Sequence, residues 1–329
     1  MSAPTSTRAR VGEPLAEVTR RDEVGGRDLV ESVHLGHAVL TGADGEVLAA
    51  VGEATLPVYV RSAAKPVQAT ACLELLDGAD TPDPAELAVA WASHRGEAQH
   101  LDAVRRLLAR SGTAADDLTC PPASPEADPG AAPTRLHHNC SGKHALFALT
   151  GARLGLDRDA LLDRDGPLQA AVLAQLGDAF GPVHGVAVDG CGAPAVAVEL
   201  VGLARMFAQV AGHERFRAVR EAGFAHPELV GGQGRLETAL LAAGAVAKVG
   251  AEGIYGVGWL APDGGPRGFA VKATDGATRG VAALTVGLLR ELGVIDGDVW
   301  SPPPPLGGGQ PVGVVRPTDA LRRLAVGAA

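Results

Sequence analysis

The chain has 329 residues, which is long enough for one large domain with an inserted lobe. Its hydrophobic content of 46% and charged content of 20% are typical of a globular protein, and it contains no apolar run of 18 residues that would predict a membrane span. The formal net charge of −9, without a basic stripe, argues against a nucleic-acid partner. No apolar stretch follows the N-terminal arginines, so no secretory signal is predicted and we expect a cytoplasmic protein.

The first quarter of the chain predicts strands followed by a helix. Leu15–Thr19 is a short half-apolar strand, and Val33–Val51 has the pattern of a hairpin around Gly42–Gly45. An apolar helix over Val67–Leu76 follows, with Pro66 in its first turn, where the missing N–H matters least.

The middle of the chain is predicted to be mainly helical. Helical spacing of apolar residues recurs in 84–91, 98–110, 142–154, 168–180 and 196–210. A Pro/Ala-rich loop is expected at 120–133, and a short strand at 183–188. Strands return at 253–261 and 268–274, and a helix follows at 277–292.

This order predicts an α+β fold in a single domain covering 1–329. Segments 15–60 and 250–292 are expected to form a lobe built on an antiparallel sheet, and 62–245 a mainly helical lobe. Segment 300–312 is expected to be a Pro/Gly-rich loop. A cleft between two such lobes is a common place for a small-molecule site.

Lysine is scarce in this chain, which carries most of its positive charge on arginine. The four lysines are Lys65, Lys143, Lys248 and Lys272. Lysine can lose its proton when desolvated, whereas arginine stays charged, so a scarce lysine is a candidate for chemistry. Lys248 is predicted to be an ordinary cation at a helix end.

The segment Ser62-x-x-Lys65 places a hydroxyl and an amine on one face of a predicted helix. A neutral lysine there can take the serine proton and make the serine a nucleophile. The same spacing also occurs by chance on exposed helix faces.

Ser93-His94-Arg95-Gly96-Glu97 ends an apolar helix with polar groups. This segment is either a helix terminus, with Gly96 at the position after the cap, or a set of side chains that faces the cleft.

The run from His137 to His144 is polar at almost every position, and packing alone does not account for it. Its Cys140, together with Cys191 in the turn Asp189–Gly192, forms a candidate thiolate pair for zinc. A third ligand would have to come from Lys143, a histidine or Asp189. Without a secretory signal, free or metal-bound thiols are favoured over disulfides.

Two further segments complete the pattern. Lys272 lies on the last predicted strand and is either an amine that serves a second serine or an ordinary lysine on an edge strand. The glycine-rich turn 230–235 precedes a helix and ends at Arg235, but it lacks the full phosphate-loop pattern.

Taken together and in this order, the motifs resemble those of the Rhizobium etli-type L-asparaginases, also called class 3 or the asparaginase II family. The resemblance spans roughly residues 15–292. It rests on the following segments: Arg61-Ser62-x-x-Lys65-Pro66, Ser93-His94-x-Gly96-Glu97, the run 138–144, Asp189-Gly190-Cys191-Gly192-x-Pro194, Gly232-x-Gly234-Arg235 and Lys272-x-x-Asp275-Gly276.

The resemblance implies a serine β-lactamase/glutaminase-like fold, a homodimer and L-asparagine as substrate. It implies two Ser–Lys pairs, Ser62 with Lys65 and Ser93 with Lys272. It also implies a zinc site on Cys140, Lys143 and Cys191, with Asp189 and His144 as its neighbours.

These residues predict acyl transfer to water, with Ser62 attacking the side-chain amide carbon and Lys65 taking its proton. The substrate carboxylate needs a cation, for which Arg61 and Arg235 are candidates, and the substrate ammonium needs an acid, for which Asp189 and Glu97 are candidates.

Four other functions remain open from the sequence. They are a glutaminase, another Ser–Lys amidohydrolase such as a β-lactamase or peptidase, a cysteine enzyme using Cys140 and His144, and an inactive sensor of zinc or an amino acid. Asparagine and glutamine differ by one methylene, which a pocket distinguishes by only about 1–3 kcal/mol.

Overall fold

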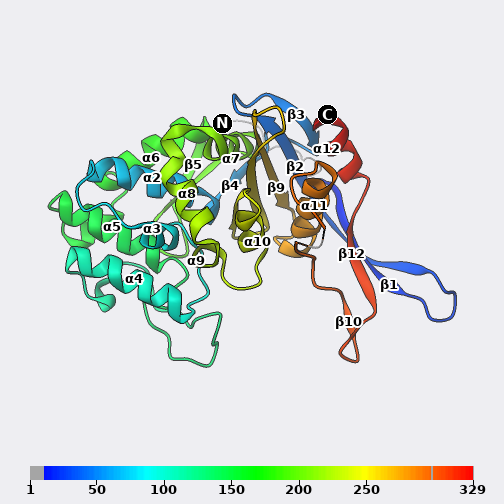
Figure 1. The fold of residues 1–329 in the computed structure, drawn as a ribbon, viewed down its shortest axis with the longest axis horizontal. Helices are drawn as coiled ribbons and strands as arrows, with labels where there is room; N and C mark the ends of the chain where they lie inside the picture. Colours follow the sequence, from blue (N-terminus) through cyan, green and yellow to red (C-terminus); the bar gives the residue numbers. More distant parts are fainter. Residues whose placement is uncertain (1–10, 298, 329) are drawn as a thin grey trace.

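The computed structural model describes residues 11–297 and 299–328. The fold is α+β, as predicted, with a mainly helical half next to a large antiparallel sheet (Figure 1). No helix among the described residues is both long and apolar enough to cross a membrane.

The large sheet is antiparallel throughout, with the strand order β12-β1-β2-β9-β8-β7 and with β3 paired to β2. Its strands are β1 (Glu13–Arg21), β2 (Asp28–Gly42), β3 (Val47–Val51), β7 (Val246–Gly250), β8 (Ile254–Leu260), β9 (Pro266–Ala273) and β12 (Gly313–Pro317). The central pair β2–β9 joins the two ends of the chain, which confirms that early and late strands share one sheet.

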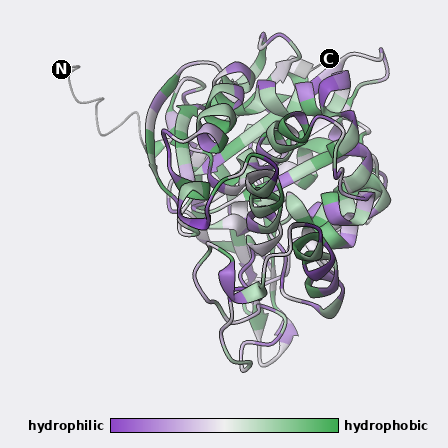
Figure 2. Cartoon of the chain, turned by 90° about the vertical axis from the view of Figure 1, so that its left-hand side faces the viewer, coloured by the Kyte–Doolittle hydropathy of each residue, from purple (hydrophilic) through white to green (hydrophobic). Residues whose placement is uncertain are grey.

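Helices cover both faces of this sheet. Side chains alternate between the faces of a strand, so on β9 Ala270 joins the core under α7 (Leu200–Gly212), whereas Phe269 and Val271 join the core under α11 (Thr278–Glu291). Helix α12 (Ala320–Ala328) packs on β3 and β1. Figure 2 shows the resulting concentration of hydrophobic residues on the inner strands and helix faces.

Glycine in the strands lets α7 approach the sheet closely. A Cβ added at Gly258 would lie 1.9 Å from the Phe207 carbonyl oxygen of that helix, so no side chain fits there.

The helical half of the molecule surrounds a small second sheet with the order β4-β6-β5. These strands are β4 (Pro57–Tyr59), β5 (Val183–Val188) and β6 (Pro194–Glu199). The helices are α2 (Lys65–Leu76), α3 (Pro84–Ala90), α4 (Ala98–Ser111), α5 (Ser141–Arg153), α6 (Pro167–Phe180), α8 (Arg217–Ala225), α9 (Pro227–Gly231) and α10 (Leu236–Ala242), with short 3-10 turns at η1 (Arg61–Ala64), η2 (Ala115–Asp117), η3 (Arg158–Leu162) and η4 (Glu214–Phe216).

Local sequence explains several of these helix ends. Helix α3 begins with a capping box, in which Asp83 accepts from the Glu86 N–H and Glu86 accepts from the Asp83 N–H. Helix α4 ends at Gly112, whose backbone is left-handed, with φ of 65°.

Two predicted segments and one residue differ from the structure. Residues 194–199 form strand β6 before α7 begins, so the predicted helix over 196–210 was wrong at its start. The short apolar run at 194–199 suits a strand as well as a helix. Segment 300–312 contains a two-residue strand pair, β10 (Leu306–Gly307) with β11 (Gln310–Pro311). Lys248 lies on strand β7 and is buried, so its prediction as a helix-end cation was wrong.

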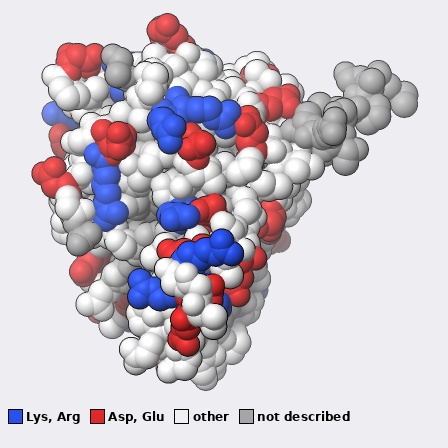
Figure 3. All heavy atoms as spheres, turned by 90° about the vertical axis from the view of Figure 1, so that its right-hand side faces the viewer, with Lys and Arg blue, Asp and Glu red and all other residues white. Residues whose placement is uncertain are grey.

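Charged side chains of both signs are interspersed over the face of the molecule seen in Figure 3. This face shows no basic stripe, in keeping with the net charge of −9.

Candidate active site

A cavity of about 510 Å³ lies where the helical half meets the large sheet, and both predicted catalytic serines line it. Ser62 and Ser93 come from the helical half, and Val249 and Tyr255 come from the sheet. Its volume suits a small molecule.

Ser62 lies in the short turn η1, immediately before helix α2. The preceding residue, Arg61, has a φ of 49°, a left-handed conformation that costs a non-glycine residue roughly 1–2 kcal/mol. An ion pair with Asp189, 2.7 Å from Arg61 Nε to Asp189 Oδ1, holds this residue in place. Within the described residues the Ser62 hydroxyl has no hydrogen-bond partner, so it is free to meet a ligand in the cavity.

Ser93 lies between two buried lysines. Lys65 Nζ donates to Ser93 Oγ at 3.0 Å and also to the Ala92 carbonyl oxygen. Lys248 Nζ donates to the same Ser93 oxygen at 2.8 Å and to the Val249 carbonyl oxygen at 3.3 Å. The structure therefore forms a chain of three groups, Lys65–Ser93–Lys248, beside Ser62.

Two ammonium groups this close repel one another, and the charged form of Lys248 is the one that is destabilised. Burial, with the Lys65 charge as the next cause, lowers the pKa of Lys248 from its ordinary 10.5 to about 7. Lys248 can therefore act as a neutral amine near pH 7.

Lys272 does not lie next to Ser93. It lines a separate hollow of about 400 Å³ with Arg61 and Glu252, and its amine donates to its neighbour's carbonyl oxygen on Ala273. The predicted pairing of Ser93 with Lys272 was therefore wrong. Lys272 is on β9 and pairs in register with His37 and Ile254, whereas Lys248 is on the edge strand β7 that faces the helical half.

His94, the residue after Ser93, has a structural position. Its Nδ1 accepts from the Gly96 N–H at 3.1 Å, so its Nε2–H faces Ser141 Oγ at 2.8 Å. Burial holds the pKa of His94 well below its ordinary value, so the ring is neutral. These bonds tie the Ser93 segment to the start of helix α5.

The three predicted metal ligands converge next to this cavity. Lys143 Nζ lies 3.1 Å from Cys191 Sγ. A hydrogen bond from Cys191 holds the pKa of the Cys140 thiol well below its ordinary value despite its burial, so Cys140 and Cys191 are direct neighbours. Burial acts to lower the pKa of Lys143, but the neighbouring charges of Cys191 and Cys140 outweigh it and raise that pKa.

This cluster adjoins the serine cavity through Asn139. Cys140 Sγ donates to Asn139 Oδ1 at 3.1 Å, and Asn139 lines the cavity. All four cysteines are buried and free, in agreement with the preference for thiols over disulfides.

The donor set fits zinc only with the lysine included. The described part of the chain holds no group of three or more His, Cys, Asp or Glu residues placed to bind a metal ion. Two buried thiols and one buried amine do meet here, and thiolates are ligands that zinc prefers. Binding would require the amine to release its proton to solvent.

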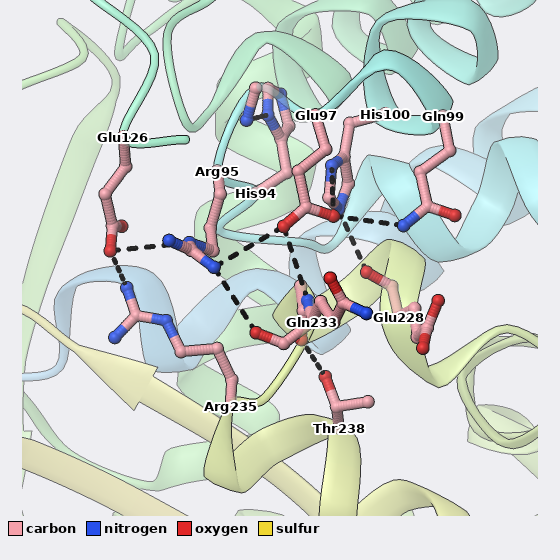
Figure 4. Close-up of polar contacts among 12 residues, drawn as sticks. His94, Arg95, Glu97, Gln99, His100, Glu126, Glu228, Gln233, Arg235 and Thr238 are labelled. Carbon is pink, nitrogen blue, oxygen red and sulfur yellow. Dashed lines mark hydrogen bonds and ion pairs between the residues drawn. The ribbon is translucent and has the colours of Figure 1, made fainter. Parts of the chain in front are cut away.

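Of the predicted substrate-binding residues, Arg235 lines the serine cavity. Its guanidinium pairs with Glu126, which Arg95 also approaches at 3.5 Å (Figure 4). Glu97 lies behind this network, where it accepts from the Gln233 N–H at 3.4 Å and faces Arg95 at 3.5 Å (Figure 4). Glu97 therefore supports the glycine-rich turn rather than the cavity wall.

The other predicted substrate-binding residues lie away from this wall. Arg61 and Asp189 pair with each other, and Arg61 lines the hollow that contains Lys272. His144 is buried, with Nδ1 at 2.6 Å from Thr119 Oγ1 and its ring edge-on to Phe147. Burial, then the nearby Lys143 charge, holds the pKa of His144 well below its ordinary value.

The proline-rich segment forms part of the cavity wall. Trp300, Pro302 and Pro303 line it, and Trp300 Nε1 donates to the Gly234 carbonyl oxygen at 3.1 Å. This segment was predicted only as a loop.

The family model for L-asparaginase II matches residues 19–317 of the chain. The chain belongs to the L-asparaginase II family. A comparison with curated proteins gives no match. The match includes both serines, Lys65 and Lys248 that bond to Ser93, Lys143 beside Cys191, and the large sheet from Thr19 in β1 to Pro317 in β12.

Three residues of this L-asparaginase II family member were missed from the sequence: Glu237 and Tyr255, which line the cavity, and Lys248, which bonds to Ser93 beside it. A signal for Lys248 was present. Val246–Gly250 is a short β-branched run bounded by Gly244 and Gly250, a pattern that predicts a buried strand and hence a buried lysine.

Proposed function

We propose that this chain is an L-asparagine amidohydrolase, which releases L-aspartate and ammonia by Ser–Lys catalysis on a serine β-lactamase-like fold. The observation that carries the proposal is the position of Ser93 Oγ between two buried lysine amines, at 3.0 and 2.8 Å, in a cavity that Ser62 also lines. Membership of the L-asparaginase II family supports the choice of substrate.

Ser62 is the proposed nucleophile because its hydroxyl is free and because Lys65 follows it by one helical turn. A neutral Lys248 takes a proton from Lys65 through Ser93, which leaves Lys65 neutral. Lys65 then accepts the Ser62 proton as the Ser62 oxygen attacks the amide carbon. The proton returns to the amide nitrogen, the C–N bond breaks, ammonia leaves, and water hydrolyses the acyl-serine by the same relay.

Arg235 is the proposed cation for the substrate carboxylate, since of the two candidates it lines the serine cavity. Arg61, with its partner Asp189, is then assigned to holding the turn before Ser62.

We extend the proposal to zinc, held by Cys140, Cys191 and Lys143. Bound there, zinc would supply a positive charge that helps to position the substrate. The convergence of these three side chains and their link to the cavity through Asn139 support this assignment.

A homodimer is also proposed. Tyr59, Val186 and Val188 expose apolar surface on the small sheet, with 46%, 40% and 79% of each residue exposed, and a second copy of the chain would cover such surface. Light scattering coupled to gel filtration tests it: twice the chain mass supports a dimer, and the single chain mass rejects it.

Ammonia release from L-asparagine by the purified protein, with L-glutamine in parallel, tests the function. We expect release from asparagine and at least about tenfold slower release from glutamine, as one methylene allows. Release from glutamine alone would reassign the substrate, and release from neither would reject the amidohydrolase.

Variants at the two serines test the division of labour. We expect Ser62→Ala to lose up to roughly a millionfold in turnover, because it removes the nucleophile. Ser93→Ala should lose about 10²–10⁴-fold, because it removes a proton relay. Mass spectrometry of protein quenched with substrate should find the acyl group on Ser62. An adduct on Ser93 would reverse the two roles.

A further inference from the structure

The end of the cavity formed by α10 and β8 holds two polar groups that the proposed chemistry does not use. Glu237 lies in the first turn of α10, and Tyr255 lies on β8; both line the cavity that contains Ser62 and Ser93. They are 8% and 3% exposed, respectively.

The Glu237 carboxylate has neither a hydrogen bond nor an ion pair among the described residues. The other similarly buried glutamate, Glu86, shows what such a carboxylate ordinarily requires. It is 3% exposed, caps α3 and pairs with Arg110 at 2.7 Å. A buried carboxylate without a cation is costly, so the open position beside Glu237 points to a cationic ligand.

The cations near Glu237 are already engaged. Arg235 pairs with Glu126, and Lys248 donates to Ser93 and to the Val249 carbonyl oxygen. Glu237 influences Lys248 through its charge without an ion pair within 4.0 Å.

The Tyr255 hydroxyl is buried and has no hydrogen-bond partner. Burial, then the Glu237 charge, raises the pKa of Tyr255 well above its ordinary value, so the hydroxyl keeps its proton and can donate. A carboxylate acceptor, a phenol donor and the Arg235 cation together match the ammonium and carboxylate of an amino-acid head group.

We propose that Glu237 binds the α-ammonium group of the substrate and that Tyr255 donates a hydrogen bond to its α-carboxylate. The site then selects amides that carry a free α-amino group. This inference rests on the proposed amidohydrolase function and names the residues that give it specificity.

Paired substrates test the inference. L-asparagine and succinamate carry the same amide and carboxylate, but succinamate lacks the amine. Glu237→Gln should raise KM for asparagine at least about tenfold and leave kcat/KM for succinamate within about twofold, because only asparagine offers the ammonium. Tyr255→Phe should weaken the binding of both substrates by a similar factor, because both carry the carboxylate. Glu221→Gln, the same change at an exposed position on α8, is the matched control and should leave both values unchanged.

Equal losses for asparagine and succinamate in Glu237→Gln would show that Glu237 acts through Lys248 instead, and would overturn the inference. Unchanged kinetics for both substrates would overturn it as well.

A wild-type protein that releases no ammonia would reject the proposed function but still leave the inference testable by calorimetric binding. Tighter binding of L-aspartate than of succinate, lost in Glu237→Gln but kept in Glu221→Gln, would support it. Equal binding of aspartate and succinate by the wild type would overturn it.

Discussion

Lys248 is the residue whose environment most directly ties structure to function. Its amine is buried against Ser93, with the charge of Lys65 close by, and its pKa falls to about 7. The proposed relay needs this amine to be neutral at the start of each turnover.

The pH dependence of the reaction follows from this pKa. Because the pKa of Lys248 is lowered from 10.5 to about 7, the amine loses its proton as the pH rises through about 7. We expect kcat/KM for asparagine to fall about tenfold for each pH unit below this value and to level off above it. Initial rates between pH 5 and 9 measure it, and a flat profile across pH 7 would contradict the role of Lys248.

Burial of the Lys248 ammonium should also lower the free energy of unfolding of the protein. The folded state binds its proton more weakly than the unfolded chain, so the cost is full below about pH 7 and disappears as the pH approaches 10.5. Lys248→Met should therefore raise the free energy of unfolding at pH 6 by on the order of 2–4 kcal/mol, and by much less at pH 10. Thermal unfolding at both pH values measures this, and a lower Tm for the variant at pH 6 would show that the amine stabilises the fold.

At this scale, the spacing of residues along the chain was enough to predict which serines share the cavity and which thiols and lysine lie together. Ser62 and Ser93 line one cavity, and the three predicted zinc ligands meet. The choice between Lys248 and Lys272 depended on which strand faces the helical half. That follows from sheet order, which the spacing of residues along the chain does not reveal.

At the scale of elements, the approach of strand β7 to the turn before Ser62 assembles the site. Gly250 makes this approach possible, since an added Cβ would lie 2.7 Å from the Val60 carbonyl oxygen and 2.9 Å from Ile254 Cγ2. Both of these neighbours belong to packed segments that cannot move freely.

Gly250→Ala should therefore displace β7 from the turn and move Lys248 away from Ser93. We expect a loss of about 1–3 kcal/mol in stability and of at least about tenfold in kcat. Gly177→Ala is the control, because nothing lies within 4 Å of its added Cβ on helix α6. Chemical denaturation and initial rates check both variants. Equal stability and equal kcat in the two variants would show that the close approach of β7 at Gly250 is not needed for the site.

The elements themselves were largely predictable. Periodic apolar spacing located α2 to α6, and the turn at Gly42–Gly45 located the hairpin of β2 and β3. The pattern failed where a short apolar run suits either structure, at the start of 196–210, because tertiary pairing of β6 between β4 and β5 decides the outcome.

At the scale of the whole molecule, the site forms where the helical half meets the large sheet. The sequence predicted such a cleft, but it left out part of the wall. Trp300, Pro302 and Pro303 return from the C-terminal segment to close the cavity, a long-range contact without a local signal.

The proposed zinc site predicts a metal content that mutation should abolish. Purified protein should contain about one zinc per chain by elemental analysis, and Cys191→Ala should lose it because a thiolate ligand is removed. Cys72→Ala, which removes a buried cysteine outside this cluster, is the control and should keep it. Wild-type protein free of zinc after growth in zinc-supplemented medium would reject the site.

The most direct test of the account is the rate of ammonia release from L-asparagine by Lys248→Met compared with Lys272→Met. The structure predicts that Lys248→Met loses about 10²–10⁴-fold, because it removes the amine 2.8 Å from Ser93, and that Lys272→Met stays close to wild type. Loss of turnover in Lys272→Met, with Lys248→Met still active, would contradict the proposed relay.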